Sequence, residues 1–227
     1  MSKETEYPAR EPIFNAPPYI IGLCGVIVVI HAATSLLGQE AAIWMLQRFA
    51  YSPLYLWSAL GAVDLNIPAL RLGTLVTHAF LHADWLHLGV NVGLLLSFGA
   101  VVERIFGGVH MLLVFLLSAV AGAVTQTFFE GTAPFVMVGA SATVYAMMAL
   151  VVCIMIVSKQ GGMRQRGLIM AVVLMGLNLL TGLIGLGDFL GGAEIAWQAH
   201  LGGFVLGLLV FKPLLWLRRR RLSQAGR

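Results

Sequence analysis

The chain has 227 residues, of which 59% are hydrophobic and 11% are charged, and its mean hydropathy is +0.89. A soluble domain carries about 25% charged residues, so this composition excludes an ordinary soluble protein and indicates an all-α integral membrane protein. The net charge of +4 comes mainly from Arg218 to Arg221, which follow the last apolar stretch. A basic cluster in that position is typical of a cytoplasmic membrane anchor, and we expect no nucleic acid among the partners.

Six stretches are almost free of Asp, Glu, Lys and Arg over the roughly 20 residues that a helix needs to cross hydrocarbon. The first is not followed by a clear small-residue cleavage site, so we expect it to remain as a helix. The sequence thus predicts a cytoplasmic tail at 1–17, a six-helix membrane domain at 18–217 and a basic cytoplasmic tail at 218–227. The expected helices are 18–38, 85–102, 108–129, 138–158, 167–187 and 195–217.

Two connections have compositions of their own. The long one, 39–84, is rich in aromatic residues, which favours short helices lying in the outer membrane interface. The alternative is a small extramembrane subdomain that packs on the bundle. The short one, 187–194, is rich in glycine and predicts a mobile cap over the last helix.

Lysine and arginine set the expected orientation, because they concentrate in cytoplasmic connections. With the N-terminus inside, 12 of the 14 Lys and Arg residues are cytoplasmic, and only Arg48 and Arg71 are outside. We therefore predict a multi-pass protein of the bacterial plasma membrane with both termini in the cytoplasm. The same orientation places Ser141, His200 and His87 near the outer face.

Polar side chains near the ends of apolar helices cost free energy unless they contact one another or water. Ser141 begins the fourth stretch and His200 lies near the start of the sixth. A serine hydroxyl becomes a nucleophile when a base accepts its proton, and histidine is the natural base. No carboxylate is obviously placed to orient His200, which favours a Ser-His dyad over a triad. Tyr145 follows Ser141 by one helical turn and could stack on the imidazole instead.

Acyl transfer also requires hydrogen-bond donors for the oxyanion. His87 and Asn91 are four residues apart, so they project from one face of the second helix. The backbone N–H of Ser141 lies at a helix start, where the amides lack intrahelical partners. Gly139 lets the backbone approach a reacting carbonyl closely. His87, Asn91 and the amide of Ser141 are the expected oxyanion donors, and Gly139 supports them.

Small residues at four-residue spacing predict close contact between the fourth and sixth helices. They are Ala142, Ala146 and Ala149 on the former and Ala196, Ala199, Gly203 and Gly207 on the latter. Such contact would bring Ser141 and His200 within hydrogen-bond reach. A second polar set could line a water-filled indentation that opens to the outside. It comprises His78, His82, Asp84, Asn91, Ser141 and Gln198.

The segments from His78 to Asn91, from Gly139 to Ser141 and from Ala199 to Gly203 together resemble the rhomboid intramembrane serine proteases. The resemblance extends over about 70–211. It implies a six-helix rhomboid-like bundle that cleaves transmembrane proteins near the outer face. Substrates would enter beside the second and fifth helices, under a mobile cap.

By the same resemblance, Ser141 is the nucleophile, His200 the base, and His87 and Asn91 the oxyanion donors. Gly139 and Tyr145 match supporting positions, and His82 matches a histidine that holds structure and water. One position departs from the family pattern, because Ala142 stands where Gly is usual. The added methyl group removes no catalytic function.

Several alternatives remain beside the protease hypothesis. Serine and histidine in membrane helices can serve packing alone, at about 0.6 kcal/mol per hydrogen bond. The spacing of His78, His82 and His87 is not that of a zinc site, and we expect no metal and no cofactor. A catalytically weak or inactive adaptor that binds transmembrane clients is the main alternative, with Ala142 as its support. A channel or transporter is disfavoured because the sequence has no inverted repeat.

Overall fold

The computed structural model describes residues 16–63, 68–184 and 195–225, and within these ranges the ordered elements are helices. The α-helices are α1 (Pro18–Leu36), α2 (Gln39–Phe49), α3 (Pro53–Ala59), α4 (Thr74–Thr77), α5 (Trp85–Leu94), α6 (Ala100–Phe106), α7 (Gly108–Glu130), α8 (Ser141–Val157), α9 (Met163–Ile184) and α11 (Trp197–Ala225). Two 3₁₀ segments, η1 (Ala69–Gly73) and η2 (His78–Phe80), flank α4, and a π-helical segment, η3 (Leu95–Gly99), joins α5 to α6. The structure is therefore all-α over the residues it describes.

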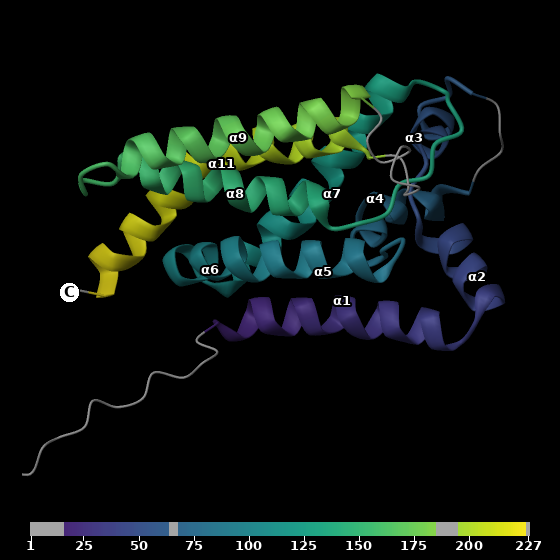
Figure 1. Ribbon diagram of the computed structural model, residues 1–227, viewed down its shortest axis with the longest axis horizontal. Helices are drawn as coiled ribbons and strands as arrows, with labels where there is room; N and C mark the ends of the chain where they lie inside the picture. Colours follow the sequence, from purple (N-terminus) through teal and green to yellow (C-terminus); the bar gives the residue numbers. More distant parts are fainter. Residues whose placement is uncertain (1–15, 64–67, 185–194, 226–227) are drawn as a thin grey trace, which may run out of the picture.

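The long helices lie side by side along the longest axis of the molecule, and α2, α3 and α4 gather at one end (Figure 1). α1 starts and α11 ends at the opposite end of the bundle. α11 also changes direction in its C-terminal part (Figure 1), and Pro213 lies inside this helix. A proline within a helix removes a backbone hydrogen bond and bends the axis. Arg218 to Arg221, expected in a separate tail, continue α11.

Five helical stretches are long and apolar enough to span a membrane, in the part of the chain that is described. They are α1, the continuous helix from Trp85 to Phe106, α7, α9 and α11. α8, expected as the fourth span, has 17 residues and is shorter than these. The chain is thus a multi-pass membrane protein, and the count of six spans stays a prediction. The expected cap, 187–194, lies outside the described residues.

α8 is the central helix and packs against α7, α9 and α11. Glycines make its contact with α11 close: a Cβ atom at Gly203 would overlap the carbonyl oxygen of Ala142, and one at Gly207 would overlap that of Ala146. On the other side of the same seam, a Cβ atom at Gly122 of α7 would lie 2.6 Å from the Ala142 methyl group. The predicted contact between small residues of α8 and α11 is confirmed, and it extends to α7.

The connection between α1 and α5 forms the short helices that its composition predicts. Its anchor is Tyr51, whose side chain is fully buried and whose hydroxyl lies 2.5 Å from the Thr127 hydroxyl of α7. The backbone of Tyr51 also exchanges two hydrogen bonds with Met137, at 3.0 and 2.8 Å. These bonds fasten the α2–α4 layer to the segment that leads into α8. The interfacial position of this layer stays a prediction.

The start of α1 is held by a carboxylate from another helix. Both carboxylate oxygens of Glu103 in α6 accept hydrogen bonds, from the backbone N–H groups of Tyr19 at 3.1 Å and Ile20 at 2.7 Å. The first N–H groups of a helix have no intrahelical partner, and a negative charge there also complements the helix dipole. Glu103 therefore caps α1 and joins it to the bundle.

Candidate active site

Ser141 is the first residue of α8, and the loop before it has a backbone that only glycine adopts easily. Gly139 has φ +118°, and a Cβ atom there would lie 2.9 Å from Nε2 of His87. The N–H of Gly139 donates to the carbonyl of His78 at 3.0 Å, which fixes the loop to η2. The turn explains why the helix begins at Ser141 and not at the expected residue 138. It leaves the Ser141 amide among the unpaired N–H groups of a helix start.

The structure brings the hydroxyl of Ser141 and the imidazole of His200 together. Oγ of Ser141 lies 2.7 Å from Nε2 of His200, although the two residues are 59 positions apart. The glycine seam between α8 and α11 makes this possible, because Gly203 lies one turn after His200 and directly against Ala142. His200 is buried and Ser141 is half-buried. A hydroxyl and an imidazole in such contact can exchange a proton.

The imidazole of His200 is held on two further sides. The ring of Tyr145 stacks on it, with ring centres 4.5 Å apart and planes inclined by 9°. The amide oxygen of Asn178 in α9 lies 2.5 Å from Nδ1 of His200. The sequence predicts the stacking on Tyr145, but it does not predict the contact with Asn178. A signal for it was present, because it is a polar residue within an apolar span, as Ser141 and His200 are.

His87 and Asn91, the expected oxyanion donors, differ in where their side chains point. The ring of His87 lies against Gly139, and its Nδ1 accepts a hydrogen bond from the Ala83 N–H at 3.5 Å. A neutral ring that accepts at Nδ1 carries its proton on Nε2, the nitrogen next to Gly139. The amide nitrogen of Asn91 instead donates to the His87 carbonyl at 2.9 Å. Asn91 therefore has one N–H engaged within its own helix and one left to donate.

The N-cap of α5 positions His87. Asp84 is the N-cap of α5, and its carboxylate accepts the His87 backbone N–H at 2.8 Å. An aspartate in this position satisfies one of the unpaired amides of the first turn. The cap fixes the start of α5 and with it the direction of the His87 side chain towards the loop at Gly139.

His78 and His82 are buried beside the same loop and are neutral. Nδ1 of His78 bonds to the Thr74 carbonyl at 2.8 Å, and burial lowers its pKa to about 4. Nε2 of His82 accepts the N–H of Ala140 at 3.5 Å, and burial, together with His87 and His31, lowers the pKa of His82 to about 3. A neutral imidazole can accept such a bond, so His82 supports the residue that precedes Ser141.

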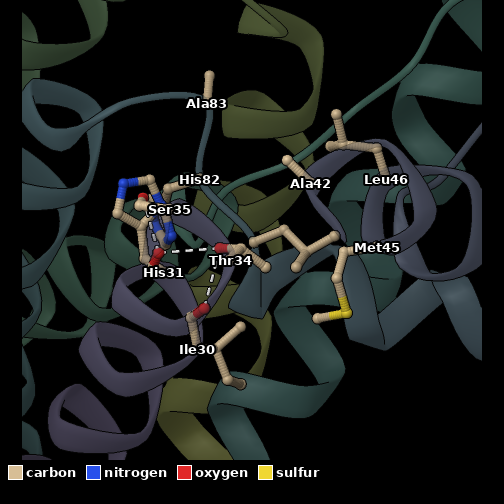
Figure 2. Close-up of a pocket in the computed structure, with 10 residues that line it drawn as sticks. Ile30, His31, Thr34, Ser35, Ala42, Met45, Leu46, His82 and Ala83 are labelled. Carbon is tan, nitrogen blue, oxygen red and sulfur yellow. Dashed lines mark hydrogen bonds between the residues drawn. The ribbon is translucent and has the colours of Figure 1, made fainter. Parts of the chain in front are cut away.

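A cavity of about 120 Å³ lies next to His82, between the C-terminal half of α1, α2 and the turn at 81–83 (Figure 2). Its polar lining includes His31, Thr34, Ser35 and His82. Of the residues expected to line a water-filled indentation, His82 is the one that lines this cavity. Nε2 of His31 and Nδ1 of His82 are buried without a hydrogen-bond partner. The cavity therefore has a few polar groups within a mostly apolar lining, next to the candidate active site.

Gln198, another residue that the sequence predicts in that indentation, takes part in a separate polar contact. Its amide donates to the Glu130 carboxylate at 3.2 Å, and Gln126 donates to the same oxygen at 3.1 Å. The Gln126 oxygen in turn accepts the N–H of Ala199 at 3.1 Å. These bonds hold the start of α11, and therefore His200, against the end of α7. Among the described residues, no three His, Cys, Asp or Glu side chains are placed to hold a metal ion.

Comparisons with known proteins identify the family that this chain resembles. The model of the Rhomboid domain matches residues 69–217, which contain every residue of the candidate site. The chain is 29% identical to the rhomboid protease GlpG of Serratia proteamaculans over 209 residues, covering 91% of this chain and 65% of that protein. It is 32% identical to the human rhomboid-related protein 3 over 154 residues, covering 65% of this chain and 38% of that protein. The chain thus spans less than two thirds of the length of either relative.

Proposed function

The chain belongs to the rhomboid family, and we propose that it is an intramembrane serine endopeptidase that cleaves transmembrane proteins through an acyl-enzyme on Ser141. The main support is the 2.7 Å contact between Oγ of Ser141 and Nε2 of His200. Two helices contribute these groups, and a seam of glycines holds the helices together. Simple packing does not require an activated hydroxyl next to an accepting imidazole.

In the proposed reaction, Nε2 of His200 accepts the proton of Ser141 as Oγ attacks the scissile carbonyl carbon. The C–N bond of the tetrahedral intermediate then breaks, and His200 returns the proton to the leaving amine. A water molecule, deprotonated by the same imidazole, hydrolyses the ester and releases the carboxylate and free Ser141. In each half of the reaction His200 accepts one proton and returns it, so the proposed reaction requires no cofactor.

The developing oxyanion requires donors on the side of Ser141 that faces Gly139. The candidates are the backbone N–H of Ser141, Nε2–H of His87 and the amide of Asn91. His87 supports this proposal through its protonated Nε2 next to Gly139. The side chain of Asn91 would donate to the same oxygen through its second N–H, either directly or after a small rotation. Losing one such donor typically lowers the rate about 10²- to 10³-fold.

The substrate is proposed to be a membrane-spanning segment that presents its peptide bond near the outer face. Apolar side chains are exposed along the spans, as expected for lipid contact, and α1 and α9 contribute many of them. Ser141 begins α8 on the side of the bundle towards α2, α3 and α4, whereas the basic residues of α11 lie at the other end (Figure 1). With the arginines in the cytoplasm, cleavage takes place towards the outer leaflet.

The test is labelling by a fluorophosphonate, combined with cleavage of a panel of single-span proteins in co-expression. The wild type should be labelled and should cleave a panel member, while Ser141→Ala and His200→Ala should do neither. Ala133, in the connection before α8, offers a control, because Ala133→Ser adds a hydroxyl without a base. Labelling or cleavage that persists in Ser141→Ala contradicts the proposal. Binding of panel members by the wild type without any cleavage would indicate the adaptor instead.

A further inference from the structure

The catalytic imidazole contacts a third polar side chain, which comes from a different span. We infer that Asn178 is a positioning residue, which fixes the proton and the orientation of His200 and makes both depend on where α9 lies. The inference rests on the proposed function of Ser141 and His200. It goes beyond it because a Ser-His dyad alone does not need α9.

The contacts of the Asn178 amide determine which of its two atoms faces His200. One atom of the amide faces the backbone carbonyl of Trp197 at 3.2 Å, and the other faces Nδ1 of His200 at 2.5 Å. A carbonyl oxygen only accepts, so the atom next to Trp197 must be the amide nitrogen. The amide oxygen is then the atom next to His200. It also only accepts, so Nδ1 of His200 must carry the proton.

This assignment has a direct consequence for the chemistry. A neutral imidazole with its proton on Nδ1 has a lone pair on Nε2, the atom that lies 2.7 Å from Oγ of Ser141. The wrong tautomer would present an N–H to the serine and could not accept its proton. Asn178 therefore selects the tautomer that acts as a base. Stacking on Tyr145 fixes the plane of the ring, and the bond to Asn178 fixes its rotation within that plane.

Glu130, the carboxylate that bonds to the start of α11, is engaged elsewhere, which leaves this role to an amide. Glu130 accepts hydrogen bonds from Gln126 and Gln198. An uncharged partner orients the imidazole but stabilises its protonated form less than a carboxylate does. This difference supplies a test, because Asn178→Asp keeps an oxygen acceptor for Nδ1 of His200 and adds a negative charge, while it loses the N–H that donates to the Trp197 carbonyl.

α9 is the most peripheral of the long helices, so the bond to His200 depends on how it is docked. In its most apolar 18-residue window only 11% of the residues are buried, against 28–39% for the other long spans. Its buried residues are Gly167, which packs near Val152 and Met155 of α8, and Asn178. If the half of α9 that contains Asn178 moves away, the bonds to Nδ1 of His200 and to Trp197 break together. The position of α9 is thereby coupled to the readiness of the base.

The experiment compares Asn178→Leu, Asn178→Asp and the matched control Thr181→Val in cleavage and fluorophosphonate labelling. Thr181 lies one turn further along α9, and its hydroxyl donates to the Asn178 backbone carbonyl at 3.0 Å. Asn178→Leu should lower kcat and the labelling rate by about 10- to 100-fold with little change in KM, since the imidazole loses its orientation while substrate contacts remain. Thr181→Val should stay within about 2-fold of wild type, since it leaves the Asn178 side chain in place.

Asn178→Asp gives the readout that a purely structural role would not change. It retains the acceptor, so most labelling should return, and the acid limb of the rate profile should move to higher pH because a carboxylate favours the protonated imidazole. If Asn178→Leu does not fold, the Asp profile decides alone. An unchanged acid limb in Asn178→Asp, or an Asn178→Leu variant as active as Thr181→Val, overturns the inference. A wild type that is neither labelled nor active would instead refute the proposed function itself.

Discussion

The two helices that contact His200 from opposite sides are held in very different ways. α8 is the most buried helix, and its contact with α11 leaves no room for a Cβ atom at Gly203 or Gly207. α9 has few buried side chains and exposes leucines and valines along most of its length. The nucleophile is thus fixed relative to the base by close packing, whereas the group that orients the base sits on a loosely packed helix. We call the contact between α8 and α11 the rigid side of the site. The contact between α9 and His200 is its loosely packed, adjustable side.

The largest expected effect comes from Gly203→Ala, which would break the rigid side of the comparison. Its new methyl group would overlap the Ala142 carbonyl, and backbone atoms cannot move aside as a flexible side chain can. We expect a loss of about 3 kcal/mol or more in the free energy of unfolding, and loss of labelling at Ser141. Unfolding in detergent micelles and fluorophosphonate labelling measure the two effects.

The matched control for this variant lies on the loosely packed helix. Gly176 of α9 has open space where a Cβ atom would be placed. Gly176→Ala should therefore be neutral or slightly stabilising, since alanine has the higher helix propensity. If the two variants had equal stability, the seam between α8 and α11 would not be the close contact described above.

Acidification should destabilise the edge of the rigid side. There, His78 and His82 hold the loop that leads to Ser141. Burial lowers the pKa of His78 to about 4 and that of His82 to about 3, whereas in the unfolded chain both protonate near their ordinary value. The unfolded state therefore binds protons first. The stabilisation is complete above about pH 6.5 and is lost as the pH falls towards the folded-state values.

Between pH 7 and pH 5 the free energy of unfolding should fall by about 2 kcal/mol for each of the two histidines. Thermal or chemical unfolding at both pH values measures the fall. His78→Gln should make the fall smaller by about 2 kcal/mol, since glutamine does not titrate. A drop of the same size in the double variant His78→Gln/His82→Gln would show that other groups cause it.

Gly182→Leu tests the loosely packed side. A Cβ atom at Gly182 would overlap the side chain of Trp197, whose backbone carbonyl accepts the hydrogen bond from Asn178. The variant should push α9 outwards and lower the labelling rate of Ser141 about 10-fold, with a change in stability below about 1 kcal/mol. Gly176→Leu, on the same helix in open space, is the control. An effect of equal size in both variants would show that the position of α9 does not determine the activity of His200.

The sequence predicted the rigid part of the site better than the adjustable part. Ser141, His200 and the small-residue stripes are visible because polar and small residues interrupt apolar stretches at fixed spacing. Asn178 interrupts the α9 stretch in the same way, but it lies outside the three short motifs on which the family resemblance was recognised. Its partner is 22 residues away on another helix. Only the folded geometry shows that a single amide bonds to both His200 and Trp197.

Local turns set the other limit on prediction. Apolar runs located the spans, but α8 begins at Ser141 because of the positive φ of Gly139, and α9 begins at Met163, before its expected start. Hydropathy does not report the residue at which either helix begins. The bonds that attach Tyr51 to Met137 and Thr127 join segments more than 70 residues apart, and no periodicity in the chain reports such a contact.

The smallest expected effect is that of Ala142→Gly, which restores the residue usual in this family at the centre of the rigid side. The Ala142 methyl group is buried, faces Gly122 of α7 and lies in the apolar cluster with Ala123 and Ala199. Removing it should lower the free energy of unfolding by about 1 kcal/mol and leave a small gap between α7 and α8. Labelling and cleavage should change by less than about 3-fold, because the methyl group packs against α7 and supplies no atom to the Ser141–His200 contact. A large gain in cleavage would show that this methyl group restrains α8, so that the packing of the rigid side limits the rate as well as the stability.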